Sequence, residues 1–399
     1  MTFRTLLRRD GPVLGYGFAF TFGSSVGQTF FISLFIPGIA VAVSMSETRL
    51  AAFYGVATVA SAMALPWFGR LIDRADIARY GLMTGAALAV GCWLMAAAIN
   101  PWMVLAAMFV LRLAGQGLMS HVGLTGVARY FDRDRGKALS LTGLGHAAGE
   151  GVLPILMVTA IAVLGWRMTY GVAGAVVGLA LVPLATWLIL NNPVFRRAKG
   201  AEGASGVRQP NPLLRSGAFW AHLPLLLLSP LTVTALIFHQ GLIAQSKGLE
   251  LTVFAAAFAA FALVQIPTSL IVGPVVDRIG SRGPLLLHLA PLAVGAGLLA
   301  TFKGAWAVWA FLALMGVTNA AGAILRTAIV AEWVAPARMG EARSFLTALM
   351  VLSTAIGPAL YGVLMEAGVS VSGLLWLASA STLAALAPGV IYGLAVRER

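Results

Sequence analysis

The segment Gly69-Arg-Leu-Ile-Asp73-Arg74 decides the fold of this chain, because a related segment, Gly273-Pro-Val-Val-Asp277-Arg278, follows it at an offset of 204 residues. Two further groups of residues recur at the same offset without a gap. A repeat of this length predicts two halves of like structure that follow one another along the chain. The other matches are Gly136, Ala138 and Ser140 with Gly340, Ala342 and Ser344, and Pro154 with Pro358.

The sequence around these segments is apolar enough to lie in a membrane. Of its 399 residues 59% are hydrophobic and 10% are charged, whereas a soluble domain has about 25% charged residues. A helix needs about 20 apolar residues to cross the bilayer core. We therefore expect an all-α membrane protein with twelve transmembrane helices, arranged as two six-helix bundles related by a parallel pseudo-repeat. The predicted spans are 13–43, 51–72, 80–99, 102–127, 138–164, 168–190, 218–245, 251–272, 284–302, 305–328, 342–366 and 370–394.

The polar residues divide the chain and orient it. The one long polar stretch, 191–217, separates an N-terminal bundle at 1–190 from a C-terminal bundle at 218–399. If the termini and this linker lie in the cytoplasm, 21 of the 27 Lys and Arg residues fall on that side, and Lys and Arg favour cytoplasmic loops. We expect an integral protein of a bacterial inner membrane with both termini in the cytoplasm and an uncleaved first helix. The four cations on the outer side are Arg49, Arg167, Lys247 and Lys303.

Six plus six helices, a cytoplasmic linker and the Gly69–Arg74 segment resemble the major facilitator superfamily, whose signature there is G-x-L-x-D-R-x-G. The sequence departs from this signature at Asp76, where Gly is usual, while the second copy keeps Gly280. Within the superfamily, the segment Tyr130–Gly149 is similar to the Y-F-x-[KR]-R-R…G-x-x-x-G pattern of monocarboxylate and oxalate/formate porters. Gly165-Trp166-Arg167 fits the same group. The resemblance implies a secondary transporter that works by alternating access.

Three ionisable residues are expected near the middle of the membrane. Arg112 lies about 16 Å from the outer end of its span at 1.5 Å per residue, where a charge is costly unless it is paired or faces water. Glu150 has a similar depth in the next span and is the expected partner of Arg112, and His146 shares its helix face. The two alternatives are a structural ion pair and a site for substrate or proton coupling. The segment Arg112–Gly117 resembles the arginine motif of the fourth helix of the superfamily.

The remaining candidates are weaker. Arg326 is expected to act in gating or in attracting anions, or to extend to the interface. Polar residues inside spans either line the cavity or bond between helices, and these are Gln28, His121, His239, Gln265 and Asn319. The repeated segments end helices at the cytoplasmic face, where their charges form a gate or only set the topology. The gate candidates are Gly69, Asp73, Arg74, Gly273, Asp277 and Arg278.

The sequence holds no phosphate-binding loop and no nucleophile constellation, so we expect neither an enzyme nor a cofactor. The single Cys92 excludes an intrachain disulfide, and no metal motif occurs. The net charge of +13 follows from topology rather than from nucleic-acid binding. Our hypothesis is a monomeric, gradient-driven transporter that carries a small, monocarboxylate-like organic anion with a proton (symport). The alternative is proton-antiport efflux of amphipathic or drug-like compounds.

Overall fold

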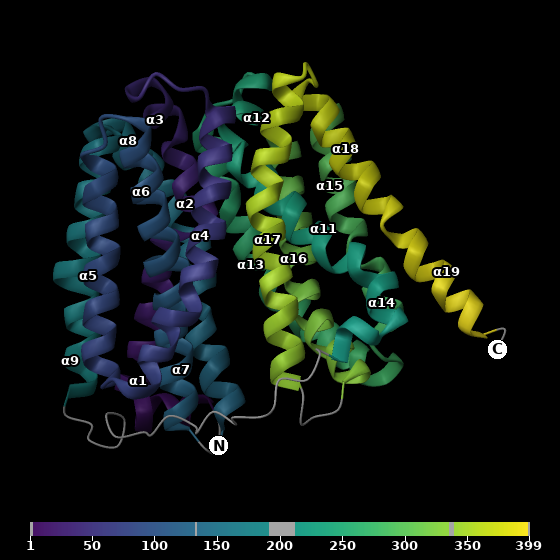
Figure 1. Cartoon of the computed structure of the whole chain (residues 1–399), viewed down its shortest axis with the longest axis horizontal. Helices are drawn as coiled ribbons and strands as arrows, with labels where there is room; N and C mark the ends of the chain where they lie inside the picture. Colours follow the sequence, from purple (N-terminus) through teal and green to yellow (C-terminus); the bar gives the residue numbers. More distant parts are fainter. Residues whose placement is uncertain (1–2, 132–133, 191–211, 335–338, 398–399) are drawn as a thin grey trace. The chain divides into compact units, whose positions relative to one another are not determined.

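The computed structural model describes residues 3–131, 134–190, 212–334 and 339–397, and the regular structure in these ranges is entirely helical. The backbone separates into two compact units, Met1–Ser205 and Gly206–Arg399. Figure 1 shows helices that run side by side within each unit. Most of the predicted linker at 191–217 lies outside the described residues. Its described end forms one 3₁₀ turn, η5 (Pro212–Arg215), before Ser216 caps the next helix.

The first unit contains the helices of the first six spans, and several of them begin at side-chain caps. Ser46, Asp76 and Asn100 each accept a hydrogen bond from a backbone N–H of the helix that follows. The elements are α1 (Phe3–Ser24), η1 (Ser25–Gly27), α2 (Thr29–Ile32), η2 (Ser33–Phe35), α3 (Ile36–Ala42), α4 (Glu47–Arg74), α5 (Ile77–Ala96), α6 (Pro101–Leu111), η3 (Arg112–Met119), α7 (Ser120–Tyr130), α8 (Arg135–Ala175), η4 (Val176–Leu181) and α9 (Val182–Leu190).

In the second unit the three longest helices are continuous, and the other three spans are each divided. Its elements are α11 (Gly217–Phe238), α12 (Gln240–Ser246), α13 (Leu251–Ile279), α14 (Arg282–Leu287), α15 (Ala290–Thr301), α16 (Ala305–Trp333), α17 (Met339–Glu366), α18 (Val371–Ala384) and α19 (Leu386–Arg397). The predicted span 218–245 is divided at His239, the span 284–302 at 288–289, and the span 370–394 at Ala385.

The number of spans agrees with the sequence. Among the described residues, ten helices are long and apolar enough to cross a membrane, and one bent pair forms a further span. One of the ten, Arg135–Leu190, has 56 residues and would measure about 84 Å as a straight helix, far more than the roughly 30 Å of a bilayer core. Gly165 interrupts it with φ 77° and ψ 159°. Two spans therefore meet at Gly165, and the total is the expected twelve.

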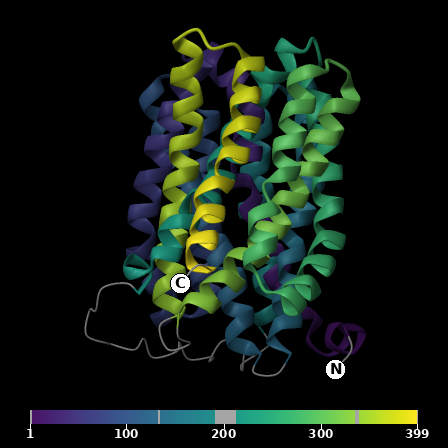
Figure 2. The ribbon, with the colours of Figure 1, turned by 90° about the vertical axis from the view of Figure 1, so that its right-hand side faces the viewer.

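The first span differs from the prediction of one continuous helix at 13–43. The helix already begins at Phe3, and a kink at Asp10 turns residues 3–9 away from the rest of α1 (Figure 2). A second break at Gln28 bends the span by 47°. The buried carboxylate of Asp10 explains the first kink, because it accepts hydrogen bonds from the Tyr130 hydroxyl at 3.1 Å and from Arg9 Nε at 2.7 Å.

The two units repeat the same helix pairings. In the first unit α1 packs on α8 and α9, α4 on α6, and α5 on α6 and α8. In the second unit the elements at matching places pair alike, since α11 packs on α17 and α19, α13 on α16, and α15 on α16 and α18. The sequence offset of 204 residues thus corresponds to one helix arrangement built twice.

Small residues bring α1 and α8 into close contact. A Cβ atom added to Gly149 would collide with the Ser25 hydroxyl, and one added to Gly145 would collide with Thr21 and with the α1 backbone. The Thr21 hydroxyl donates a hydrogen bond to the Thr142 carbonyl at 2.6 Å. Small residues allow helix backbones to approach in a membrane, where a hydrophobic driving force between helices is absent. This contact fixes the first span beside the helix that carries His146 and Glu150.

Two of the four cations predicted on the outer side bind carbonyl groups at the C-terminal ends of corresponding helices. Arg167 Nη1 donates to the Ala96 carbonyl at the end of α5, at 2.7 Å, and its guanidinium lies 4.3 Å from the Trp166 ring. Lys247 Nζ donates to the Ala300 carbonyl near the end of α15, at 2.9 Å. Ala96 and Ala300 are themselves 204 residues apart. A cation at a helix C-terminus satisfies a free carbonyl and complements the helix dipole.

Candidate functional site

The break in the first span frees one backbone carbonyl inside the membrane. Gln28 has an extended backbone (φ −85°, ψ 157°), and the amides of Phe31 and Ile32 donate to its own carbonyl. The Gly27 carbonyl therefore loses the amide of Phe31, its partner in a continuous helix. Gly27 also lies directly against Gly115, since a Cβ on Gly27 would come within 2.7 Å of the Gly115 Cα. Only glycine fits at this crossing of the first and fourth spans.

Arg112 donates a hydrogen bond to the Gly27 carbonyl that the break leaves free. It is the first residue of η3, a π-helical segment of the kind that often occurs at functional sites, and it is only 3% exposed. Its Nη1 atom donates to the Gly27 carbonyl at 3.4 Å, and its Cζ atom lies 5.0 Å from the centre of the Tyr54 ring. Its Nε–H group is buried without a partner. The Tyr54 hydroxyl shares a hydrogen bond of 2.5 Å with that of Thr29.

The predicted ion pair between Arg112 and Glu150 is wrong for this structure. In the part of the chain that the structure describes, no carboxylate lies within 4.0 Å of the Arg112 guanidinium. The guanidinium is directed toward Gly27 and Tyr54, on the first and second spans, whereas Glu150 is a half-buried residue of α8. The spacing from the span ends gave the depth of both residues. It carried no information on the direction in which each side chain leaves its helix.

His146 connects α8 to the first span. Its Nδ1 atom lies 3.4 Å from the hydroxyl oxygen of Ser24, and that hydroxyl donates to the Thr21 carbonyl at 2.7 Å. The Ser24 oxygen is therefore an acceptor toward Nδ1–H of His146. His146 and Glu150 are one turn apart on α8, and Ser24 precedes the break at Gln28 by four residues. His146, one of the predicted pair of ionisable groups on α8, thus contacts the first span rather than Arg112.

The other candidates of the first unit are dispersed. Gln28 is half-buried at the break, and His121 is exposed on α7, with Nδ1 3.4 Å from the Thr125 hydroxyl. Gly69 is partly buried in α4, and the side chains of Asp73 and Arg74 lie outside the described part.

The departure from the signature at Asp76 has a structural reason. The Asp76 carboxylate accepts hydrogen bonds from the amides of Ala78 and Arg79 at 3.0 and 3.1 Å, and so caps α5. In the second copy the turn instead uses Gly280 at φ +79°, a conformation that favours glycine.

A further residue, Arg129, was not among the candidates. Its Nη1 atom donates to the Ile72 carbonyl at 3.1 Å and holds the end of α4.

The turn that follows the gate candidates of the second unit contacts an acidic residue that was not predicted. Gly273 is partly buried, and Asp277 and Arg278 are exposed at the end of α13. Glu332, near the end of α16, accepts a hydrogen bond from the Ser281 amide at 2.9 Å and lies 3.6 Å from Arg282 Nε. Its position as the one carboxylate of a largely apolar helix, in the last turn, was the available signal.

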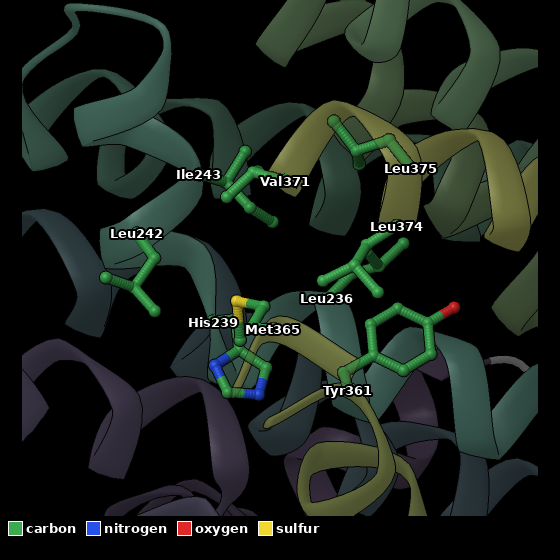
Figure 3. A pocket seen from close by; sticks show the side chains of 9 residues that line it. All are labelled: Leu236, His239, Leu242, Ile243, Tyr361, Met365, Val371, Leu374 and Leu375. Carbon is green, nitrogen blue, oxygen red and sulfur yellow. The ribbon is translucent and has the colours of Figure 1, made fainter. Parts of the chain in front are cut away.

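The polar residues inside the second unit bond between helices. Asn319 on α16 donates to the Gln265 side chain on α13 at 3.1 Å. His239, at the break between α11 and α12, donates from Nε2 to the Pro358 carbonyl at 3.0 Å, while its Nδ1 is buried without a partner. Figure 3 shows His239 at the edge of a small apolar pocket with Tyr361 and Met365. Its volume of about 10 Å³ is close to the space for one water molecule.

Arg326 lies on α16 beside Gly322 and is partly buried. Unlike Arg112, it has no hydrogen bond or ion pair with any described residue. The described residues contain no group of three or more His, Cys, Asp or Glu side chains that could hold a metal ion.

Comparisons with known proteins agree with this architecture. A family model described as Major Facilitator Superfamily matches residues 17–242 and 225–399. A bacterial homolog of the human lysosomal transporter Spinster, solved in an inward-facing and occupied conformation, superposes with a TM-score of 0.72 at 16% identity, over 98% of this chain and 97% of that one. A mutant of the nucleoside transporter NupG gives a TM-score of 0.73 at 13% identity, over 96% and 98%.

The POT family transporter PepTSo gives a TM-score of 0.70 at 13% identity, over 97% of this chain and 98% of that one. None of the curated proteins compared with the chain matches it in sequence. At such identities the solved structures share the fold alone, and the residues around Arg112 have to be interpreted from their own geometry.

Proposed function

Because the chain belongs to the major facilitator superfamily and is a secondary transporter that works by alternating access, we propose that its substrate is a small organic anion, monocarboxylate-like in charge, carried together with a proton. The observation that supports this proposal is the environment of Arg112. Its guanidinium is 3% exposed, and its described contacts are one carbonyl oxygen and one aromatic ring.

The charge of Arg112 is left without a full counter-charge. A carbonyl oxygen and a ring face carry only partial negative charge, whereas an ion buried away from water needs a partner of opposite charge or contact with water. A carboxylate substrate supplies such a charge and matches the planar fork of N–H donors that guanidinium presents. The free Nε–H is available for this contact. An acidic side chain bound to the Arg112 guanidinium would compete with the carboxylate of the substrate.

The proton-sensitive element in this proposal is the pair His146 and Glu150 on α8. His146 contacts Ser24, which lies on the same span as Gly27, the residue that binds Arg112. A change of charge on His146 alters its hydrogen bond to Ser24 and thereby the segment that leads into the break at Gln28. The first span then connects the proton site to the anion site.

The orientation and the assembly belong to the same proposal. The distribution of Lys and Arg supports cytoplasmic termini in a bacterial inner membrane, where a proton gradient is available. The transporter acts as a monomer, with the substrate, the proton and the lipid bilayer as its partners.

The test is uptake of radiolabelled mono- and dicarboxylates into proteoliposomes, with and without an inward proton gradient. We expect gradient-stimulated uptake of at least one monocarboxylate. Arg112→Gln should raise the apparent KM by roughly 10- to 100-fold, since a hydrogen bond to a charged group contributes about 1.5–3 kcal/mol. Glu150→Gln should abolish the gradient dependence.

Arg49→Gln is the matched control, because Arg49 is an exposed outer cation. It should leave uptake unchanged. If no acid is taken up under either condition, or if Arg112→Gln transports like wild type, the anion proposal is wrong. Extrusion of amphipathic compounds by proton antiport is then the function to measure.

A further inference from the structure

A second arginine lies beside a histidine inside the second unit. A Cβ atom added to Gly322 would lie 2.6 Å from Arg326 Nη1 and 3.4 Å from His288 Cδ2. These two distances place Nη1 and Cδ2 no more than about 6 Å apart. Both side chains therefore border the same space, which exists because residue 322 has no side chain. Arg326 comes from α16, and His288 follows directly after α14.

Both side chains have unused hydrogen-bonding capacity. His288 is 4% exposed, and its Nδ1–H donates to the Leu285 carbonyl at 2.6 Å. Its Nε2 atom is buried without a partner. Arg326 forms no hydrogen bond or ion pair with the residues that the structure describes. A buried polar atom without a partner is costly, and the buried Nε2 of His288 beside a partly buried guanidinium without a described partner indicates a group that is absent from the protein itself.

The surrounding charges do not supply this group. On the elements packed against α14 and α16, the titratable or charged described side chains are those of His222 on α11, Asp277 and Arg278 on α13, Arg282 on α14, Glu332 on α16, and Arg343, Tyr361 and Glu366 on α17. Of the three acidic residues, Glu332 already binds the Ser281 amide and Arg282, and Asp277 and Glu366 are exposed near the ends of α13 and α17. His222 Nδ1 bonds to the Ala218 carbonyl, and Arg343 bonds to the Thr327 hydroxyl. None of these three described carboxylates forms an ion pair with Arg326.

We propose that Arg326 and His288 form a second anion-binding site, within the C-terminal unit, and that His288 takes up a proton at Nε2 when a carboxylate binds there. Arg326 supplies the fixed charge. In the empty site the neighbouring guanidinium disfavours a second positive charge on His288. A bound carboxylate reverses this effect, because a protonated Nε2 becomes a second hydrogen-bond donor to it. One anion and one proton from solvent then bind together, with no net change of charge.

The depth of the site gives it a place in the transport cycle. Arg326 precedes Trp333, at the end of α16, by seven residues, and His288 follows Arg282, at the start of α14, by six. At 1.5 Å per residue both lie about 10 Å from helix ends that the charge distribution assigns to the cytoplasm. This site deepens the proposed function and rests on it for the class of substrate. It receives or releases the carboxylate and its proton on the cytoplasmic side.

The experiment uses the purified full-length transporter in detergent, in a weakly buffered solution at pH 7 with a pH-indicator dye. Sodium pyruvate is titrated against an equal series of sodium chloride, and binding is followed in parallel by calorimetry. Wild type should take up protons in a saturable manner that depends on pyruvate. His288→Gln should bind pyruvate with a reduced proton uptake, and Arg326→Gln should weaken binding by tenfold or more.

Gly322→Ala tests the space itself. The added methyl group displaces the Arg326 guanidinium from its place and should lower the pyruvate affinity. Gly171→Ala is the matched control, because a Cβ there meets nothing within 4 Å. Melting temperatures of all variants establish that each is folded.

The outcomes separate this site from that of Arg112. In an Arg112→Gln background, pyruvate-dependent proton uptake should persist even where transport is lost, and it should disappear when Arg326→Gln is added. Unchanged proton uptake and affinity in both His288→Gln and Arg326→Gln would overturn the second site. If proteoliposomes transport no acid but pyruvate-linked proton uptake requires His288, the proposed function fails and this site remains.

Discussion

The contact between α1 and α8 offers a quantitative test of the packing, through the substitution Gly145→Ala. A Cβ atom at this position would lie 2.8 Å from the Phe22 amide nitrogen and still closer to the Phe18 carbonyl and the Thr21 hydroxyl. Two of these three atoms belong to the α1 backbone and cannot rotate away. Since ordinary contacts are 3.4–4 Å, α1 has to move by more than half an ångström.

The change in the free energy of unfolding is the sum of two losses and one gain. Overfilling a packed interface costs about 1–3 kcal/mol. The displacement also breaks the hydrogen bond from Thr21 to Thr142, and interhelical bonds of this kind contribute about 0.6 kcal/mol in membrane proteins. The exchange of Gly for Ala inside a helix returns about 1 kcal/mol. We expect a net loss of about 1–3 kcal/mol in the free energy of unfolding.

The assay is thermal unfolding of the purified protein in detergent, followed by tryptophan fluorescence. Gly143→Ala is the control, because it lies on the same helix and a Cβ there meets nothing within 4 Å. Gly143→Ala should melt at or slightly above the wild-type temperature, and Gly145→Ala several degrees below it. If Gly145→Ala melts as high as Gly143→Ala, the close approach of α1 and α8 is not as described.

Three further predictions concern helix ends. Asp76→Ala should lower the free energy of unfolding by about 1 kcal/mol through loss of the α5 cap, and Asp76→Asn should retain most of it in the same unfolding assay. Arg167→Met should lower it by about 1 kcal/mol, because the Ala96 carbonyl loses its donor, and an unchanged melting temperature would contradict this. Burial lowers the pKa of Lys247 from its ordinary value of 10.5. The charged form is therefore less favoured in the folded than in the unfolded state, so stability should rise as the pH increases toward 10.5, and Lys247→Met should flatten this rise in melting temperature.

The fold was predictable because it depends on features that sequence records directly. Apolar runs of about 20 residues set the spans, and one constant offset set the repeat. The helix breaks were not predictable. Pro66 and Pro267 lie inside helices that remain continuous, whereas the first and seventh spans break at Gln28 and His239. Neither residue is a helix breaker by its own chemistry.

Those breaks depend on contacts that form only in the folded protein. The first is accompanied by the approach of Gly27 to Gly115 and by the hydrogen bond from Arg112 to the freed carbonyl. The second is accompanied by the bond from His239 to Pro358, a residue more than 100 positions away. Inside a membrane a backbone group released from its helix needs such a tertiary partner. A search for local breakers in the sequence cannot find it.

The sequence predicted which residue types form the candidate site but not which groups their side chains contact. A buried arginine in an apolar span was a strong signal, and Arg112 is buried. Glu332 and Arg129 were missed because each lies near a helix end, where a charged residue is ordinary. His288 was passed over for the same reason, although it is buried beside Arg326.

The repeat supplies one more argument about which residues serve function. At the offset of 204, some positions that build the scaffold match between the halves, as Ala96 and Ala300 do at two capped helix ends. The ionisable residues inside the spans do not match. If they were needed to assemble a six-helix bundle, both bundles should carry them, and each bundle packs the same helix pairs without the counterpart. Each of these ionisable residues is present in one half only. This is expected of a transporter whose two similar halves contribute different charged groups to the binding of substrate and proton. The unmatched pairs are Arg112 and Gly316, His121 and Leu325, His146 and Met350, Glu150 and Thr354, Phe35 and His239, Thr84 and His288, and Val122 and Arg326.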